Sequence, residues 1–461
     1  MIEQPQSVTV ISNQRQVQLR VERLAIHHRM KILEAEKVDG SKFYLFFYKD
    51  DFITGKTAEM KSDSLVEKAF QNGIVLQASH PLIDYYLSNR TLLLKSTKQV
   101  FQSVQKHYTP QETAFIFSYF DSFLSNDTII KLMRKHFYEY RRNGQLRLAF
   151  QILATMLHFD PTNKWALELA RKLEYQTIRN IYEGDYSELV EADPLFAEIK
   201  AYDDLKLNHT SLETIFRKEK RMFELSALRL HLYLQSPCEE ELDPQSLIHV
   251  TLSEPERARL LWLMYAEAPH HLQLRKNAFE ALMYLNKTSE AIHLLSEKQR
   301  AILQSEYELL LKAFQDESIS MAAIDFISLQ NLLGHKENRP YLDGLLHALI
   351  PRMLHEFGLS YVYSWVKPFI EKNNDLSILA TVQTMVDIQD DPDKQFQLGK
   401  LYHKMKQYDE AITCFDWEME LHPTDPTPVQ WLTKVYREMG KVEESNTYMS
   451  IYSQMQRTSQ Q

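Results

Sequence analysis

The most constraining feature of this sequence is a spacing of 34 residues between similar positions near its C-terminal end. Leu398 and Leu432 stand 34 residues apart, and so do Tyr402 and Tyr436. Apolar residues around each pair recur at intervals of three and four, which is the pattern of amphipathic helices. A unit of this length, recurring at a fixed spacing, is typical of stacked helical hairpins.

Glycine usage supports a mainly helical chain. Only 10 of the 461 residues are glycine, about 2%, where ~7% is usual. Turns with positive φ favour glycine, so we expect helices joined by short connections. Ala411, between Tyr408 and Phe415 on one predicted helix face, indicates a neighbouring helix that comes close.

Residues 392–425 resemble a tetratricopeptide repeat of the bacterial type. The matching positions of this repeat and the next one, 426–459, are Leu398, Gly399, Tyr402, Tyr408, Ala411, Phe415, Pro423, Leu432 and Tyr436. The resemblance implies that small residues let the first helix approach the second, and that the proline ends the second helix. The same intervals recur upstream at Tyr140, Ala149 and Pro161, and a further candidate centres on Ala291.

The first sixty residues have a different pattern, in which apolar and polar residues alternate. Such alternation over 7–12 and 16–26 predicts strands. Residues 30–38 and 41–49 flank Asp39-Gly40, a pair that favours a two-residue type I′ hairpin. We therefore expect a small antiparallel sheet over about residues 7–55.

The predicted fold class is mainly α: an irregular tetratricopeptide-like α-solenoid with a small N-terminal antiparallel β-rich domain. The expected divisions are a β-rich domain at 1–62, a helical connector at 63–110, a degenerate helical-repeat solenoid at 111–391 and a C-terminal repeat pair at 392–461. The open alternative is a set of unrelated helical hairpins with one genuine repeat pair at the end.

The sequence contains no recognisable catalytic motif, so we predict that the protein is not an enzyme. No two glycines lie within nine residues of each other, so phosphate-cradling loops are excluded. Neither a Gly-x-Ser-x-Gly elbow nor a His-Glu-x-x-His motif occurs. Adjacent His27 and His28 point in different directions on a regular strand, so we expect no metal there, and no cofactor.

The aromatic run FYLFFY at 43–48 places large side chains on both faces of a strand. Such a strand is either buried between two layers or offers one face to a partner. We expect burial against the helices that follow.

The resemblance also implies a binding surface, the concave side formed by the first helices of successive repeats. The inward positions are Phe396, Lys400, His403, Gln430, Lys434 and Arg437, and further upstream Lys131, Arg134, Tyr138 and Arg141. Arginine and lysine there suit a carboxylate-rich peptide, although charged helix surfaces are common in any case. The carboxylate clamp of chaperone-binding members is not matched, since Phe396 and Trp431 replace its lysine and asparagine.

Net charge and hydropathy limit the kinds of partner and the cellular location that we expect. A formal net charge of -9 disfavours general nucleic-acid binding. No run approaches the roughly 18 apolar residues of a membrane helix, so no membrane insertion is expected. Two distant cysteines and a start without an apolar leader favour the cytoplasm. No oligomeric state is indicated.

The expected function is a non-enzymatic protein- or peptide-binding scaffold or adaptor. The alternative is a peptide-responsive regulator, in which a ligand in the repeat groove controls an effector partner. Bacterial quorum-peptide receptors use such repeats with a helix-turn-helix head, whereas this head is predicted to be β-rich. A third reading is an enzyme with an unrecognised site in residues 1–110.

Overall fold

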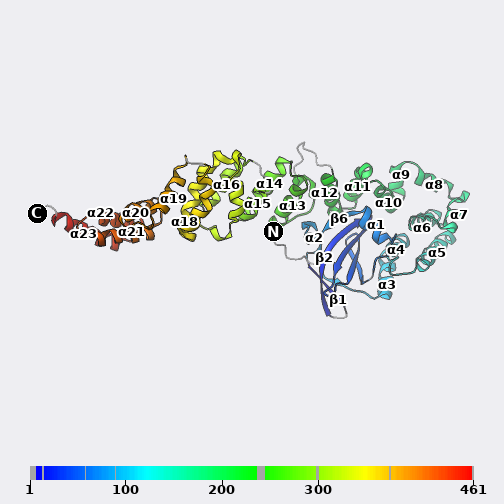
Figure 1. Ribbon diagram of the computed structural model, residues 1–461. Coiled ribbons are helices and arrows are strands. Elements are labelled where there is room, and N and C mark those ends of the chain that lie inside the picture. Colours follow the sequence, from blue (N-terminus) through cyan, green and yellow to red (C-terminus); the bar gives the residue numbers. More distant parts are fainter. Residues whose placement is uncertain are drawn as a thin grey trace. The chain divides into compact units, whose positions relative to one another are not determined.

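The computed structural model describes residues 7–12, 15–57, 59–88, 90–235, 244–296, 301–372 and 375–458. It divides into two compact units, Met1–Arg275 and Lys276–Gln461. Helices dominate both units, and the first also holds a β-sheet formed near the N-terminal end (Figure 1). The expected mainly helical fold with an N-terminal β region is confirmed, while the solenoid arrangement stays a prediction.

Within the described residues the sheet has seven strands. Five follow one another along the chain and pair antiparallel: β1 (Ser7–Ser12), β2 (Arg15–His27), β3 (Met30–Glu36), β4 (Lys42–Tyr48) and β5 (Asp51–Thr57). β6 (Ile74–Gln77) pairs antiparallel with β2, and β7 (Leu92–Leu93) pairs parallel with β1. Both of these strands lie within 63–110, where the sequence predicts a helical connector.

The turn between β3 and β4 differs from the predicted two-residue type I′ turn. The Gly40 N–H donates to the Lys37 carbonyl at 2.9 Å, and the Lys37 N–H donates to the Ser41 carbonyl at 3.0 Å. Gly40 has a φ of +80°, whereas Asp39 is not left-handed. These bonds define a three-residue loop that ends in a left-handed glycine, so one residue more separates the strands.

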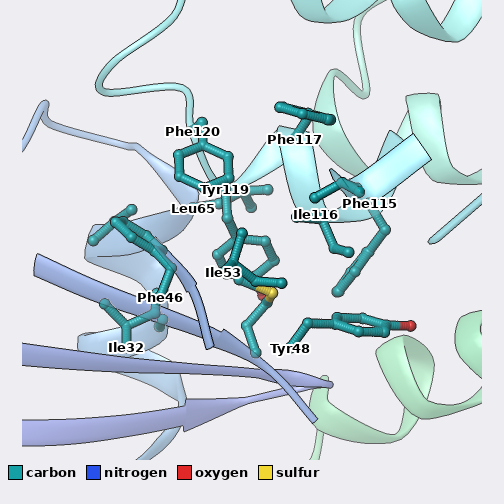
Figure 2. Close-up of a cluster of buried hydrophobic side chains, with 14 of the residues drawn as sticks. Ile32, Phe46, Tyr48, Ile53, Leu65, Phe115, Ile116, Phe117, Tyr119 and Phe120 are labelled. Atoms are coloured by element: carbon teal, nitrogen blue, oxygen red, sulfur yellow. The ribbon is translucent and has the colours of Figure 1, made fainter. Parts of the chain in front are cut away.

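Both faces of β4 are buried, as expected for the aromatic run. Tyr44, Phe46 and Tyr48 join a cluster with helices α1 (Leu65–Asn72), α3 (Thr97–His107) and α4 (Pro110–Ser118) (Figure 2). On the opposite face the Phe47 ring lies 5.3 Å from that of Tyr86 in α2 (Pro81–Leu87). The alternative of an aromatic face open to a partner is therefore wrong for this strand.

The other helices of the first unit are short and follow one another closely. They are α5 (Asn126–Arg142), α6 (Leu146–Phe159), α7 (Lys164–Ala170), α8 (Gln176–Glu183), α9 (Tyr186–Ala192), α10 (Pro194–Tyr202), α11 (Leu205–Lys218), α12 (Met222–Gln235) and α13 (Glu254–Glu267). Helix α14 (Leu272–Tyr284) contains the boundary between the two units.

The described residues of the second unit form helices and the turns between them, without a strand. Its helices are α15 (Thr288–Ser296), α16 (Gln304–Gln315), α17 (Phe326–Leu333), α18 (Arg339–Ile370), α19 (Ser377–Ile388), α20 (Gln395–Lys404), α21 (Tyr408–Leu421), α22 (Thr427–Glu438) and α23 (Val442–Thr458). Gly358 breaks α18 into two helices, with a φ of +78°.

One turn geometry recurs between consecutive helices. A residue with positive φ ends the first helix at Gly144, Lys220, Asn286, Lys406 and Gly440. In each case the N–H of the next residue donates to a carbonyl five positions earlier, as the Gln407 N–H does to Tyr402 at 2.9 Å. This is the Schellman ending of a helix, which satisfies otherwise unpaired carbonyls. The chain therefore builds helical hairpins with the same local device five times within its described residues.

Candidate functional site

Close contact between α20 and α21 forms the scaffold of the C-terminal candidate site. A Cβ added at Gly399 would lie 2.7 Å from a ring carbon of Phe415 and 3.1 Å from the Cys414 Cβ, so only glycine fits. Ala411, Phe415 and Leu432 are fully buried in one core cluster. Leu398 is buried as well, the tyrosines 402, 408 and 436 are half-buried, and Pro423 follows the end of α21. Gly399 therefore lets α20 lie close to Phe415 and Cys414 of α21, while direct contact between Gly399 and Ala411 stays a prediction.

Helices α20 and α22 place aromatic rings and ammonium groups in alternation. Lys400 Nζ lies 4.1 Å from the centre of the Phe396 ring and 5.6 Å from that of Trp431. Lys434 Nζ lies 4.5 Å from the Trp431 ring. We call Phe396, Lys400, Gln430, Trp431, Lys434 and Arg437 the C-terminal basic face. Its rings hold the lysine side chains in place without neutralising their charge.

A groove of about 390 Å³ lies in this face, between α22 and α23. It is lined by Gln430, Trp431, Thr433, Lys434, Arg437, Met449 and Tyr452. Neither Lys400, Lys434 nor Arg437 makes an ion pair with a described residue. The groove thus joins unpaired cations on α22 to an apolar wall on α23. That wall was not foreseen, because no periodic motif distinguishes Met449 and Tyr452 from other half-exposed helix positions.

His403, a further predicted contact residue, is already engaged. Its Nε2 lies 2.8 Å from a carboxylate oxygen of Glu438, and its ring meets the Trp431 ring edge at 5.2 Å. The imidazole therefore holds the indole and α22 in place, and it is half-buried.

The upstream predicted residues lie on α5, in the other unit. The Arg134 guanidinium sits 4.7 Å from the Trp165 ring, and the Tyr138 ring is 5.9 Å from the same indole. Arg141 pairs with Glu174 at 3.1 Å, while Lys131 is exposed. Of the three predicted cations on α5, Arg141 has an ion-pair partner, whereas Arg134 is held against a ring and keeps its charge. One predicted cation is therefore neutralised here, which leaves less charge for a ligand than on the C-terminal basic face.

A second concentration of polar side chains is buried beside the sheet, and it begins with the adjacent histidines. His27 and His28 each place Nδ1 2.8 Å from the Tyr119 hydroxyl, and their rings lie 3.8 Å apart. His28 has a φ of 55°, which turns its side chain to the same side as His27. His158 and Tyr202 complete this group, with ring centres 5.2 and 5.0 Å from His28.

We call His27, His28, Tyr119, His158 and Tyr202 the histidine cluster. Burial is the main cause of the pKa shifts in this cluster. It lowers the pKa of His27 to about 3 and that of His158 to about 4. It also lowers the pKa of His28 well below the usual value and raises that of Tyr119 well above it. Desolvation disfavours the charged forms, so the cluster is neutral at neutral pH.

Buried ion pairs adjoin the histidine cluster and connect the sheet to α10 and α12. Glu198 accepts from Arg29 at 3.0 Å and from Arg221 at 2.7 Å. Glu224 accepts from Arg221 at 2.9 Å and from Lys31 at 2.6 Å. Although burial alone would raise the pKa of Glu198, the guanidinium groups of Arg221 and Arg29 lower it below its usual value.

The geometry of these buried groups assigns them a structural task. Apart from His158, which is half-buried, the side chains of the cluster and of the ion pairs are almost completely buried, which closes them to a substrate. No group of three or more metal-binding side chains occurs among the described residues, and His27 and His28 instead share one hydroxyl. The hydrogen bonds of His27 and Arg29 tie the β2–β3 turn to segments more than 90 residues away in the sequence.

No helix in the described part of the chain is both long enough and apolar enough to span a membrane. Comparison with protein-family models gives no match. Comparison with curated proteins gives none either. The functional conclusion therefore rests on the geometry of the site.

Proposed function

We propose that the chain is a non-enzymatic adaptor whose C-terminal basic face binds an acidic segment of a partner protein or peptide. The observation that carries this proposal is a set of three cations around Trp431, Lys400, Lys434 and Arg437, which make no ion pair with a described residue. The chain as a whole has a net charge of -9. Unpaired cations beside an apolar wall suit a ligand with both carboxylates and apolar side chains.

The helical architecture supports this proposal. Repeated helical hairpins leave extended surfaces formed by successive helices, and the recurring Schellman turns fit such a repeat. The proposal includes the tetratricopeptide-like character of residues 392–459, the solenoid arrangement and a cytoplasmic location. In support of the last, the cysteines, Cys238 and Cys414, are far apart in the sequence.

The test is binding of a defined probe to the full chain. A fluorescein-labelled peptide rich in glutamate and leucine is titrated with wild type, with a Lys434→Glu/Arg437→Glu variant and with Lys441→Glu. Lys441 is an exposed cation beyond the groove, so it serves as the matched control. The same peptide with glutamine in place of glutamate measures how much of the affinity depends on the negative charge of the peptide.

We expect the double reversal to weaken binding about tenfold or more, and moderate salt to weaken binding to wild type. The Lys441→Glu variant and melting temperatures should change little, because the three side chains face solvent. Equal binding by both variants at low and moderate salt would remove the groove as the binding site.

A further inference from the structure

A second hollow lies in the first unit, at the exposed edge of the sheet. It has a volume of about 310 Å³ and is formed where α3 and the chain after α4 cross strand β5. Its lining residues are Thr54, Lys56, Thr57, Thr97, Val100, Phe117, Phe120, Ser122, Phe123 and Leu124. This volume is at the lower end of the range for small-molecule sites, so the hollow suits a small ligand.

The wall of the hollow is apolar and largely aromatic. Phe117 and Phe120, labelled in Figure 2, belong to the buried aromatic cluster, and they line the hollow as well. The Phe120 and Phe123 rings lie 4.9 and 5.5 Å from the Phe46 ring, which fixes their positions. A rigid wall of rings and of the Val100 side chain offers contact area for an aromatic or branched aliphatic body.

The rim of the hollow carries the ammonium group of Lys56. Lys56 Nζ donates to the Thr97 hydroxyl at 3.0 Å, and Lys37, which does not line the hollow, donates from Nζ to the Thr57 hydroxyl at 2.6 Å. Neither ammonium group makes an ion pair with a described residue. Both hydroxyls accept these bonds and keep their own protons for another acceptor.

We propose that this hollow binds a small organic anion, with its carboxylate against Lys56 and Thr97 and its apolar body on the phenylalanine wall. The rim supplies charge-assisted hydrogen bonds, which a neutral ligand of the same shape cannot use fully. The site lies in the other unit from the C-terminal basic face and does not depend on the proposed function.

The experiment compares an acid and an alcohol that share one body. Isothermal titration measures 4-phenylbutyrate and 4-phenylbutan-1-ol binding to the full chain, to Lys56→Met, to Thr97→Trp and to Lys98→Met. Thr97→Trp fills the hollow, whereas Lys98, one residue further along α3 and outside the hollow, is the charge-matched control. Melting temperatures check that each variant is folded.

The expected dissociation constant of the acid lies between about 10 µM and 1 mM. Lys56→Met should weaken acid binding about tenfold and leave alcohol binding unchanged, Thr97→Trp should abolish both, and Lys98→Met should change neither. Three results would overturn the proposal: no binding of the acid to wild type, equal affinity for acid and alcohol, or undiminished binding to Thr97→Trp.

Discussion

Acidification should destabilise the first unit well above the pH at which carboxylates titrate. In the folded state burial holds the pKa of His27 at about 3 and that of His158 at about 4, with that of His28 also well below its usual value. In the unfolded chain each imidazole titrates near 6.5. Below that pH the unfolded state binds more protons, so stability is complete above pH 6.5 and falls as pH approaches the folded values.

The magnitude follows from the difference between the two states. At pH 5, which is 1.5 units below 6.5, each unfolded histidine stabilises the unfolded state by about 2 kcal/mol. The three histidines of the cluster together then remove about 6 kcal/mol from the free energy of unfolding. Glu198 and Glu224 do not contribute in this window, because ion pairs lower the pKa of both carboxyls and their loss begins at lower pH.

The assay is urea unfolding between pH 8 and pH 5, followed by hydrogen exchange and mass spectrometry so that each unit is read separately. Peptides around residues 24–33 and 115–121 should lose stability steeply, whereas peptides from the second unit are the internal control. His158→Gln should reduce the pH slope by about a quarter at most, because burial also lowers the pKa of His80 in the same unit to about 4. His107→Gln, which removes an exposed histidine on α3, is the matched control. A flat profile for the first unit between pH 7.5 and 5 would refute the reasoning.

Two further predictions concern packing and charge burial. Ala411→Leu and Gly399→Ala should each lower the free energy of unfolding of the C-terminal hairpins by about 1–3 kcal/mol, because neither site has room for added carbons. Wild-type melting by both variants would disprove the tight contact. Glu198→Gln should destabilise the first unit by about 3–5 kcal/mol, since the buried guanidinium groups of Arg29 and Arg221 lose the carboxylate that they share and keep only Glu219 and Glu224 as partners. Denaturant unfolding measures this loss, and a change below about 1 kcal/mol would contradict the stabilising role of these buried ion pairs.

Sequence patterns predict those strands and helix contacts that depend on neighbouring residues in the chain. Alternation in residues 7–49 identifies the first four strands, because each buries at least one face. The small residues Gly399 and Ala411 identify a close helix contact, since few other side chains fit there. The type of the Asp39-Gly40 turn was missed because three-residue loops accept the same dipeptide.

Contacts between segments that are distant in the sequence cannot be predicted from such patterns. Strand β7 has two residues, and its pairing with β1 is set by tertiary packing rather than by its own composition. Nothing local links His27 to Tyr119, 92 residues away, or Lys31 to Glu224, 193 residues away. Similarly, the pairing of Arg141 with Glu174 removes a cation from a predicted binding face, and only the folded chain reveals it.

Site-specific photo-crosslinking in cells tests the central claim, the binding of an acidic partner to the C-terminal basic face, most directly. A benzoylphenylalanine at position 430, an exposed residue that lines the groove, should form an adduct with an aspartate- or glutamate-rich segment of a partner. The account predicts that this adduct disappears when Lys434 and Arg437 are changed to glutamate and persists in the Lys441→Glu background. An absent adduct at position 430, or one that survives the double reversal, would contradict it.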